Sequence, residues 1–281
     1  MGKFNGVLIA SDYDNTIAYT EGALRSGGEL PPLSEENRRA MEYFMAEGGI
    51  FSVATGRALP AFAPIAPTIP MNGPTILFNG AAIYDFAQGR YLCTAFMDEA
   101  VRGRVQHLLD RFPDTAVEVY HDDNSIHAIQ PNEITRHHLH LTHLPTVVME
   151  DMGQVPSPIS KVLFESPEGT MPRLIDCIRQ QDWSAEYEVV PSAPMLLELT
   201  AHGANKGGMV ERLAAILEIP RRHVYCAGDH ANDIPMLRFA HIPFAPDNAI
   251  EAVHRVEGVH ILPHSRDSAI AVMISELDRM Y

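Results

Sequence analysis

Short apolar runs alternate with helical patterns near both ends of this 281-residue chain, and that alternation limits the possible folds most strongly. The runs Val7–Ala10, Ile50–Ala54 and Val224–Ala227 are almost wholly apolar. Such runs are typical of strands that are buried on both faces of a parallel sheet. Because helical patterns separate them, we expect an α/β fold with a doubly wound, Rossmann-like parallel sheet.

The predicted helices and further strands have recognisable limits. Ser34, followed by two glutamates, predicts a helix start, and Gly48-Gly49 predicts its end. Thr75–Phe78 is predicted to be a third strand, and Val259–Leu262 a late one. Lys206–Glu218 has its apolar residues on one side and is predicted to be a helix.

The pattern changes near Tyr84, where strand signals occur without polar clusters at their ends. Ala116–Tyr120 and Lys161–Phe164 are predicted strands, and Met171–Gln180 is a predicted helix. This mixture indicates an inserted α+β domain. We therefore expect a core of residues 1–83 and 200–281 and an inserted cap domain of residues 84–199.

Charge and composition exclude several classes of protein. The net charge of −15 argues against binding to a nucleic-acid backbone, because basic residues drive that affinity. No apolar run is long enough to span a membrane, and we expect no signal peptide. Cys93, Cys177 and Cys226 have no metal or disulfide spacing, so we expect reduced thiols and a cytoplasmic protein.

Acidic and polar residues follow the predicted core strands, at the sheet edge where α/β proteins bind ligands. These residues are Asp12, Asp14, Thr55, Asn79, Asp229, Asn232 and Asp233, with Lys206 opening a helix nearby. Several carboxylates beside one lysine repel one another unless a cation binds or a proton is retained. Hard oxygen ligands favour Mg²⁺, which pairs readily with substrate phosphate. A carboxylate, a metal, a hydroxyl and an ammonium group together suit phosphoryl transfer.

The stretches "DYDNTI", "VATGR", "NK" and "GDHAND" resemble, in order, the four motifs of the haloacid dehalogenase-like phosphatase superfamily. "FNGAAI" and "NKGGMVERLA" are similar to its Cof-type sugar-phosphatase branch. The resemblance covers nearly the whole chain. It implies an Mg²⁺-dependent phosphatase that hydrolyses a small phosphorylated metabolite, such as a sugar phosphate, through an aspartyl-phosphate.

The resemblance also implies a role for each matched residue. Asp12 would be the nucleophile and a metal ligand. Asp14 would protonate the leaving oxygen, then activate water, with its backbone carbonyl on the metal. Asp229 would be a further metal ligand, and Asp233 would act through water or by positioning its neighbours. The residues implied to hold phosphate or substrate are Thr55, Gly56, Arg57, Asn79, Lys206 and Asn232. For Arg57 and Asn79, bracing of their loops is an equal alternative.

The first motif departs from the usual pattern at one position, where Asn15 stands in place of glycine. Asparagine adopts the left-handed backbone conformation more readily than most other residues. We therefore expect Asn15 to keep the geometry of the loop.

Three segments of the insert invite a functional interpretation. The family resemblance implies that loops of the cap select the substrate. The candidate loops are residues 121–124 and Pro191–Pro194. A solvated turn is the simpler interpretation of residues 121–124. The histidine-rich segment Arg136–His143 suggests a metal site, but no acid or cysteine completes it at a suitable spacing. A polar surface element is the simpler interpretation of that segment.

Other functions use the same residue types. A phosphomutase or phosphotransferase would use Asp12 in the same way, and only a need for a bisphosphate activator would distinguish it. A phospho-accepting receiver module is much shorter and has no cap. A non-catalytic regulator is also conceivable, although every matched catalytic position is filled. The sequence specifies neither the substrate nor the oligomeric state.

Overall fold

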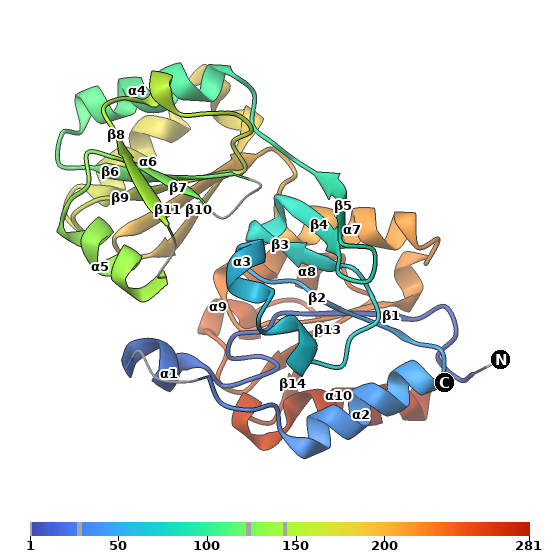
Figure 1. The fold of residues 1–281 in the computed structure, drawn as a ribbon. Coiled ribbons are helices and arrows are strands. Elements are labelled where there is room, and N and C mark those ends of the chain that lie inside the picture. Colours follow the sequence, from blue (N-terminus) through green and yellow to red (C-terminus); the bar gives the residue numbers. More distant parts are fainter. Residues whose placement is uncertain (1, 27–29, 122–124, 143–144) are drawn as a thin grey trace. The chain divides into compact units, whose positions relative to one another are not determined.

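The protein is described by a computed structural model that covers residues 2–26, 30–121, 125–142 and 145–281 (Figure 1). Its contacts divide the chain into two compact units. The first unit comprises Met1–Arg57, Phe62–Cys93 and Lys206–Tyr281, and the second comprises Ala58–Ala61 and Thr94–Asn205. Residues 84–93, which the sequence placed in the insert, therefore belong with the first unit, and residues 200–205 belong with the second.

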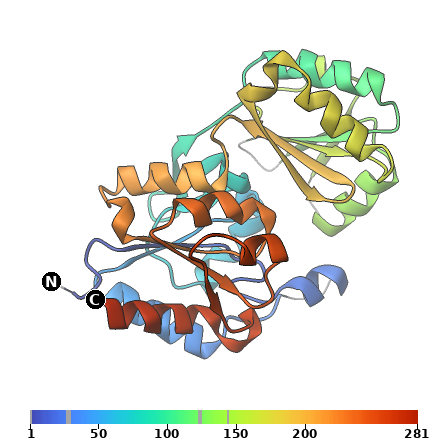
Figure 2. The same cartoon turned by 180° about the vertical axis from the view of Figure 1, so that it is seen from behind.

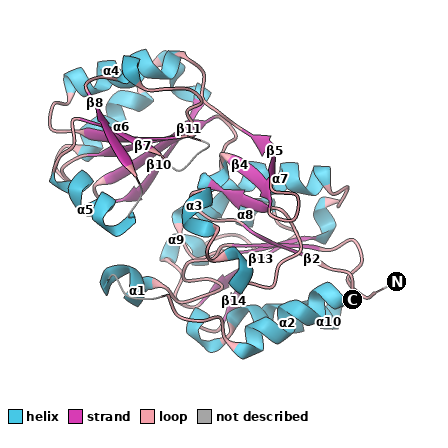
Figure 3. Ribbon diagram, viewed as in Figure 1, coloured by secondary structure: helices cyan, strands magenta, loops and turns pink. Residues whose placement is uncertain are grey.

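The first unit is built on a five-stranded parallel sheet with the order β14-β13-β12-β1-β2. Its strands are β1 (Leu8–Ser11), β2 (Ile50–Val53), β12 (Val224–Ala227), β13 (Ile242–Pro246) and β14 (His260–Leu262). Figure 3 draws the strands in magenta. The chain runs outward from β1 to β2 and then returns to β12 on the other side of β1. The strand order therefore reverses between β1 and β12, which is where open α/β sheets bind ligands. The predicted α/β fold with a parallel core sheet is confirmed.

The predicted third strand, β3 (Thr75–Leu77), belongs mainly to another sheet. It pairs antiparallel with β4 (Ala82–Asp85), and β5 (Arg90–Thr94) completes a three-stranded sheet. A bridge between Ala54 and Ile76, just beyond the end of β2, joins β3 to the parallel sheet. The strand therefore begins where β2 has already ended, and it extends the edge of the sheet that carries the polar clusters.

Helices cover both faces of the parallel sheet (Figures 1 and 2). The helices of the first unit are α1 (Glu21–Ser26), α2 (Glu35–Ala46), α7 (Lys206–Ile216), α8 (Ile234–Phe239), α9 (Glu251–His254) and α10 (Ala269–Met280). A further helix, α3 (Leu59–Phe62), spans the division between the two units. α2 and α10 pack side by side on one face, and α7 packs with α8 on the other. α2 begins as predicted, because the Ser34 side chain accepts a hydrogen bond from Asn37 N at 3.2 Å.

The second unit contains a six-stranded sheet with the order β10-β11-β9-β6-β7-β8, in which only β7 and β8 are parallel neighbours. Its strands are β6 (Ala116–Tyr120), β7 (Ile126–Ile129), β8 (Thr146–Met149), β9 (Lys161–Glu165), β10 (Tyr187–Ala193) and β11 (Leu196–Ala201). Its helices are α4 (Ala100–Arg111), α5 (Glu133–Thr142) and α6 (Met171–Arg179). Apolar residues of α4 and α6 form one core with the sheet. The predicted strands at 116 and 161 and the helix at 171 are confirmed.

Short 3₁₀ turns connect these elements: η1 (Ala66–Thr68), η2 (Phe78–Gly80), η3 (Met152–Gln154), η4 (Asp182–Glu186), η5 (Arg221–His223), η6 (Ala231–Asp233) and η7 (Ser265–Asp267). Among the described residues, no helix is long and apolar enough to cross a membrane. Cys93, Cys177 and Cys226 form no disulfide in this structure.

Candidate active site

The predicted site residues of the first unit lie at the carboxyl ends of its strands. Asp12 directly follows β1, Thr55 lies two residues beyond β2, and Asp229 lies two residues beyond β12. Lys206 is the first residue of α7. The parallel strands end at one edge of the sheet, so residues that are far apart in the sequence meet there.

Lys206 joins two of the carboxylates. Its Nζ atom donates to Asp12 Oδ1 and to Asp233 Oδ1, both at 2.6 Å. The Lys206 side chain is completely buried. One carboxylate oxygen from each of Asp12, Asp229 and Asp233 lies within 4.8 Å of the others. The structure thus brings three predicted acids and the predicted lysine into one buried cluster.

The turn after β12 holds Asp233 and Asp229 in place. Asp233 Oδ2 accepts hydrogen bonds from the backbone N–H groups of Asp229, at 3.0 Å, and His230, at 2.9 Å. Gly228 is required for this contact, because a Cβ atom there would lie 2.4 Å from the Cβ of Asp233. The Thr16 hydroxyl donates to Asp229 Oδ1 at 3.4 Å. Asp233 therefore positions both Asp229 and Lys206.

Burial makes the negative charge of this cluster costly. Burial, opposed by Lys206 and reinforced by Asp233 and Asp229, raises the pKa of Asp12 well above its ordinary value. Burial and the charge of Asp233 raise the pKa of Asp229 to about 7, although Lys206 opposes this shift. Burial by itself would lower the pKa of Lys206, but its two carboxylate partners raise that pKa instead. The lysine stays charged, whereas burial favours the protonated forms of Asp12 and Asp229.

The donor set fits a hard divalent cation. Three carboxylates face one ammonium group, which leaves a surplus of two negative charges when all of them are ionised. The candidate ligands are oxygen atoms only, and Mg²⁺ prefers oxygen ligands. A dication would offset the repulsion among the acids, which adds to burial in raising the pKa of Asp12 and of Asp229.

Asp14 lies in a separate ion pair beside this cluster. Its carboxylate accepts from Arg57 Nε at 2.8 Å and from Arg57 Nη2 at 2.7 Å, and the Thr20 hydroxyl donates to it at 2.8 Å. The guanidinium carbon of Arg57 also lies 5.5 Å from the ring centroid of Tyr13. The bracing role considered for Arg57 is therefore present in this structure. The Asp14 side chain contributes no oxygen to the three-acid cluster.

Asn15 adopts the conformation that its position requires. Its φ of 59° lies in the left-handed region, as expected for an asparagine that stands in place of glycine. Asn15 Oδ1 accepts from the backbone N–H groups of Thr20 and Glu21, at 3.2 and 3.0 Å. The side chain thus closes the loop that presents Asp14.

The residues after β2 and β3 brace one another. The Thr55 hydroxyl, which is fully buried, accepts a hydrogen bond from Arg57 N at 3.1 Å. Asn79 has a φ of 56°, and its Oδ1 atom accepts from Asn232 Nδ2 at 2.8 Å. A Cβ atom at Gly56 would lie 2.8 Å from Asn79 Oδ1. The structure therefore connects Asn79 to Asn232, which is 153 positions away in the sequence.

Asn248 was not among the predicted site residues, although it also follows a strand of the parallel sheet. Asn248 lies two residues beyond β13, at the same edge of the sheet. Its Nδ2 atom donates to the carbonyl of Asn15 at 2.8 Å, and its Oδ1 atom accepts from Ser265 N at 2.8 Å. Asn248 therefore fixes the Asn15 loop from a fourth strand.

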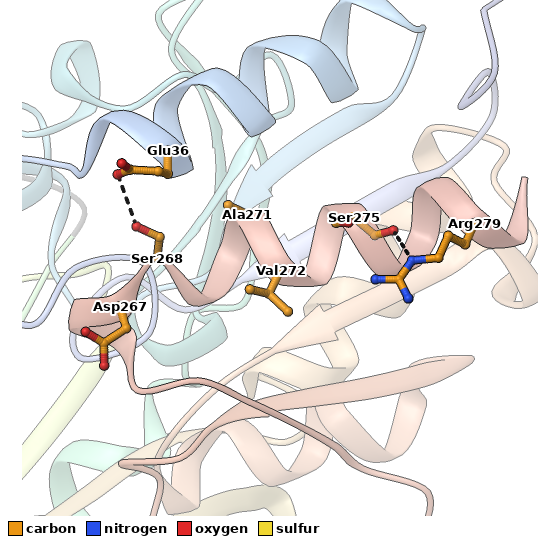
Figure 4. Close-up of a pocket in the computed structure, with 7 residues that line it drawn as sticks. All are labelled: Glu36, Asp267, Ser268, Ala271, Val272, Ser275 and Arg279. Atoms are coloured by element: carbon orange, nitrogen blue, oxygen red, sulfur yellow. Dashed lines mark hydrogen bonds between the residues drawn. The ribbon is translucent and has the colours of Figure 1, made fainter.

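A hollow on the surface carries no comparable group of residues. Figure 4 shows residues of α2, of α10 and of the turn before α10 around it, among them Glu36, Ser268, Ser275 and Arg279. Ser268 Oγ donates to Glu36 Oε2 at 3.4 Å, and Arg279 Nε donates to the Ser275 carbonyl at 3.3 Å. These groups satisfy one another and include none of the predicted site residues. The chemistry therefore belongs to the sheet edge.

Comparison with known families identifies the chain. Residues 9–274 match the family model described as haloacid dehalogenase-like hydrolase. The chain belongs to this family. The predicted membership of the haloacid dehalogenase-like superfamily, in its Cof-type branch, is confirmed, and so is the prediction of a hydrolase.

Relatives of this haloacid dehalogenase-like hydrolase are phosphatases by name. The 5-amino-6-(5-phospho-D-ribitylamino)uracil phosphatase YitU of Bacillus subtilis is 23% identical over 269 residues, covering 89% of each chain. The HMP-PP phosphatase of Serratia proteamaculans is 25% identical and covers 94% of this chain and 92% of its own. A phosphatase structure from Bacteroides thetaiotaomicron has a TM-score of 0.81 at 19% identity, covering 99% of this chain and 97% of its own.

The three segments of the insert with a predicted function differ in what the structure shows of them. Residues 122–124 of the first candidate loop lie outside the described residues. The Pro191–Pro194 segment forms the irregular end of β10 and its turn into β11. The histidine-rich segment is helical, within α5, and His143 lies outside the described residues. His137 is exposed, whereas His138 is half-buried against two glutamates, so the interpretation as a polar surface element is wrong for His138.

Proposed function

We propose that this protein is an Mg²⁺-dependent phosphoric monoester hydrolase that acts on a small phosphorylated metabolite. The observation that carries the proposal is the buried cluster in which Lys206 contacts Asp12 and Asp233, with Asp229 beside them. Family membership and the phosphatase names of the relatives support the same reaction class.

Asp12, Asp229 and Asp233 would hold the cation, with the backbone carbonyl of Asp14 as a further proposed ligand. When bound, Mg²⁺ supplies positive charge to the phosphoryl oxygens and helps to orient them. The surplus of negative charge in the cluster and its all-oxygen donor set support this assignment.

Asp12 is the proposed nucleophile. Its carboxylate oxygen forms a bond to phosphorus while the bond from phosphorus to the leaving oxygen breaks, which gives an aspartyl-phosphate. Water then attacks this phosphorus, and the bond to Asp12 breaks to release inorganic phosphate. Lys206 is held against Asp12 at 2.6 Å and would stabilise the charge on the phosphoryl oxygens in both steps.

Asp14 is the proposed general acid and then the general base. It would give a proton to the leaving oxygen and later take one from the attacking water. Arg57 holds the Asp14 carboxylate in this structure, so the proposed acid role requires Arg57 to release it. An anionic substrate offers Arg57 another partner, which connects substrate binding to the acid role of Asp14.

Further residues are proposed to contact the phosphate or the nearby substrate. Thr55 and Lys206 would hold phosphoryl oxygens, and Gly56 lets the chain pass close to Asn79. Asn79 and Asn232 are joined by a hydrogen bond and would meet the phosphate or the nearby substrate as a pair. The relative YitU is named for a phosphoribityl compound, so we propose a sugar or polyol phosphate as the substrate class. The second unit is proposed to select among them, and three free thiols favour a cytoplasmic location.

The experiment that tests this function measures phosphate release from p-nitrophenyl phosphate and a panel of phosphorylated metabolites. We expect chelated protein to be inactive, and Mg²⁺ to restore turnover. Full activity after exhaustive chelation, or no hydrolysis of any ester with Mg²⁺, would contradict the proposal. A requirement for a bisphosphate activator would identify a phosphomutase instead.

A further inference from the structure

The second unit contains a buried cluster that the proposed phosphatase chemistry does not use. It consists of Glu118 from β6, Glu165 at the end of β9, and His138 from α5. His138 Nδ1 lies 3.0 Å from both carboxylate oxygens of Glu118 and 3.6 Å from Glu165 Oε1. Both glutamate side chains are completely inaccessible to solvent.

The strand register explains why the two acids share one face of the sheet. Glu118 pairs with Leu163, and Glu165 pairs with Ala116. Paired residues share a face of the sheet, and so do residues two positions apart on one strand, so Glu118 and Glu165 lie on the same face. Val117 and Phe164, which point to the other face, belong to the apolar core with α4 and α6. The acids therefore lie on the opposite face, where α5 supplies His138.

Glu165 has no hydrogen-bond partner in this cluster. Neither of its carboxylate oxygens accepts a hydrogen bond from any described residue. The Thr135 hydroxyl, which lies on the same helix as His138, donates instead to Asn132 Oδ1 at 3.3 Å. Glu118, in contrast, accepts from the Tyr120 hydroxyl at 2.7 Å. A fully buried carboxylate that accepts no hydrogen bond is expensive, and this one lies close to two other potential ligands.

We propose that Glu118, His138 and Glu165 form a second metal site, which binds a transition-metal dication and specifically Zn²⁺. One imidazole nitrogen and two carboxylates are common zinc ligands, and three protein ligands leave one position for water. Neighbouring ligands around tetrahedral Zn²⁺ lie about 3.3 Å apart, given bond lengths near 2.0–2.1 Å. The observed separations of 3.0 and 3.6 Å bracket that value.

The nitrogen ligand distinguishes this site from the one in the first unit. Mg²⁺ favours oxygen ligands, whereas an imidazole suits Zn²⁺. The bound ion would join α5 to β6 and β9, so its contribution is to hold the helix on the sheet. It would also supply the partner that Glu165 lacks.

A proton-sharing network is the competing explanation of the same geometry. Burial and repulsion from Glu118 raise the pKa of Glu165 to about 7, so a proton kept on Glu165 would also reduce the charge of the cluster. That network needs no metal. The two explanations differ in whether Zn²⁺ binds to the cluster and stabilises it.

The experiment counts zinc on the full-length protein, with excess Mg²⁺ present to occupy the first unit. Three proteins are compared: the wild type, His138→Ala and His137→Ala. Each is incubated with Zn²⁺ and desalted, and the zinc that remains bound is measured per protein molecule. His137 is the matched control, because it is exposed on the same helix. We expect His138→Ala to lose one equivalent of zinc and His137→Ala to lose none. Equal zinc content in all three proteins would overturn the proposal.

A second variant covers the case in which His138→Ala does not fold. Glu165→Gln keeps the shape of the side chain and removes its charge. We expect Zn²⁺ to raise the melting temperature of the wild type and of His137→Ala, but not that of Glu165→Gln. An equal rise in Glu165→Gln would argue against the site. Anomalous diffraction at the zinc edge from wild-type crystals requires no variant, and a map without a peak at the cluster would also overturn the proposal.

Discussion

At the scale of single residues, Lys206 is the residue on which the candidate active site depends most. It is buried, it is charged, and its ammonium group contacts two acids that have been removed from water. Such a group is tolerated only because its partners are equally buried. The same contacts place it where a phosphoryl group bound to Asp12 would require a positive charge.

Removing that charge should therefore destabilise the protein. We expect Lys206→Met to lower the free energy of unfolding by about 3–5 kcal/mol at neutral pH without metal, because Asp12 and Asp233 are left buried and unpaired. Urea denaturation measures the change. Lys3→Met is the control, since Lys3 forms a partly exposed ion pair with Asp278 and should cost less than about 1 kcal/mol. Similar losses in both variants would contradict this account.

Asp12 should be essential for turnover but not for folding. We expect Asp12→Asn to reduce phosphate release by about 10³-fold or more, because an amide cannot serve as the nucleophile. The variant should fold, since it removes a buried carboxylate whose charge is costly. Turnover and melting temperature are measured on the same preparation. Turnover near that of the wild type would exclude Asp12 as the nucleophile.

At the scale of elements, the turn after β12 determines the geometry of the acids. Asp229 and Asp233 depend on one another, because the Asp233 carboxylate accepts from the backbone of residues 229 and 230. The turn can close this tightly only with glycine at 228. Local backbone shape therefore controls the spacing between two proposed metal ligands.

Widening this turn should impair both stability and activity. We expect Gly228→Ala to cost about 1–3 kcal/mol, because the new methyl group would overlap the side chain of Asp233. It should also lower kcat and raise the Mg²⁺ concentration needed for half-maximal activity. Gly103→Ala in α4 is the control, since its Cβ would meet no atom within 4 Å. A Gly228→Ala protein with unchanged Mg²⁺ dependence would show that the turn does not set the metal site.

At the scale of the whole molecule, the clustered acids connect folding stability to pH. The pKa of Asp229 is about 7 in the folded protein and close to 3.8 in the unfolded chain. Between these values, the folded state holds a proton that the unfolded state has released. The contribution of Asp229 to stability therefore falls as the pH rises from about 4 to about 7, and it is lost above that range.

Without metal, we expect the melting temperature of the wild type to fall between pH 5 and pH 7.5 by more than that of Asp229→Asn. The variant has no carboxyl proton at this position to release. Mg²⁺ should stabilise the wild type more at pH 7.5 than at pH 5, because it competes with the retained protons. Differential scanning fluorimetry at both pH values, with and without Mg²⁺, measures these differences. Comparison with Asp229→Asn also cancels the contribution of Glu165, whose pKa is shifted in the same direction. Equal pH dependence in both proteins would contradict this linkage.

The sequence alone determined the features that depend on neighbouring residues. Apolar runs followed by acids located β1 and β12 and the edge on which Asp12 and Asp229 lie, because a buried strand leaves its polar residues at its ends. Ser34 located the start of α2, and the side chain of Asn15 was sufficient to predict a left-handed backbone. These are local effects, and a short stretch of sequence contains their cause.

Only the tertiary structure decided which distant side chains meet. The pairing of Asp14 with Arg57, the contact of Asn79 with Asn232, and the placement of β3 beyond the end of β2 depend on how separate elements pack. The histidine-rich segment shows the same limit. The acids beside His138 lie 20 and 27 positions away, on β6 and β9, so no local spacing reveals them. The strand register and the packing of a helix on the sheet bring these charges together.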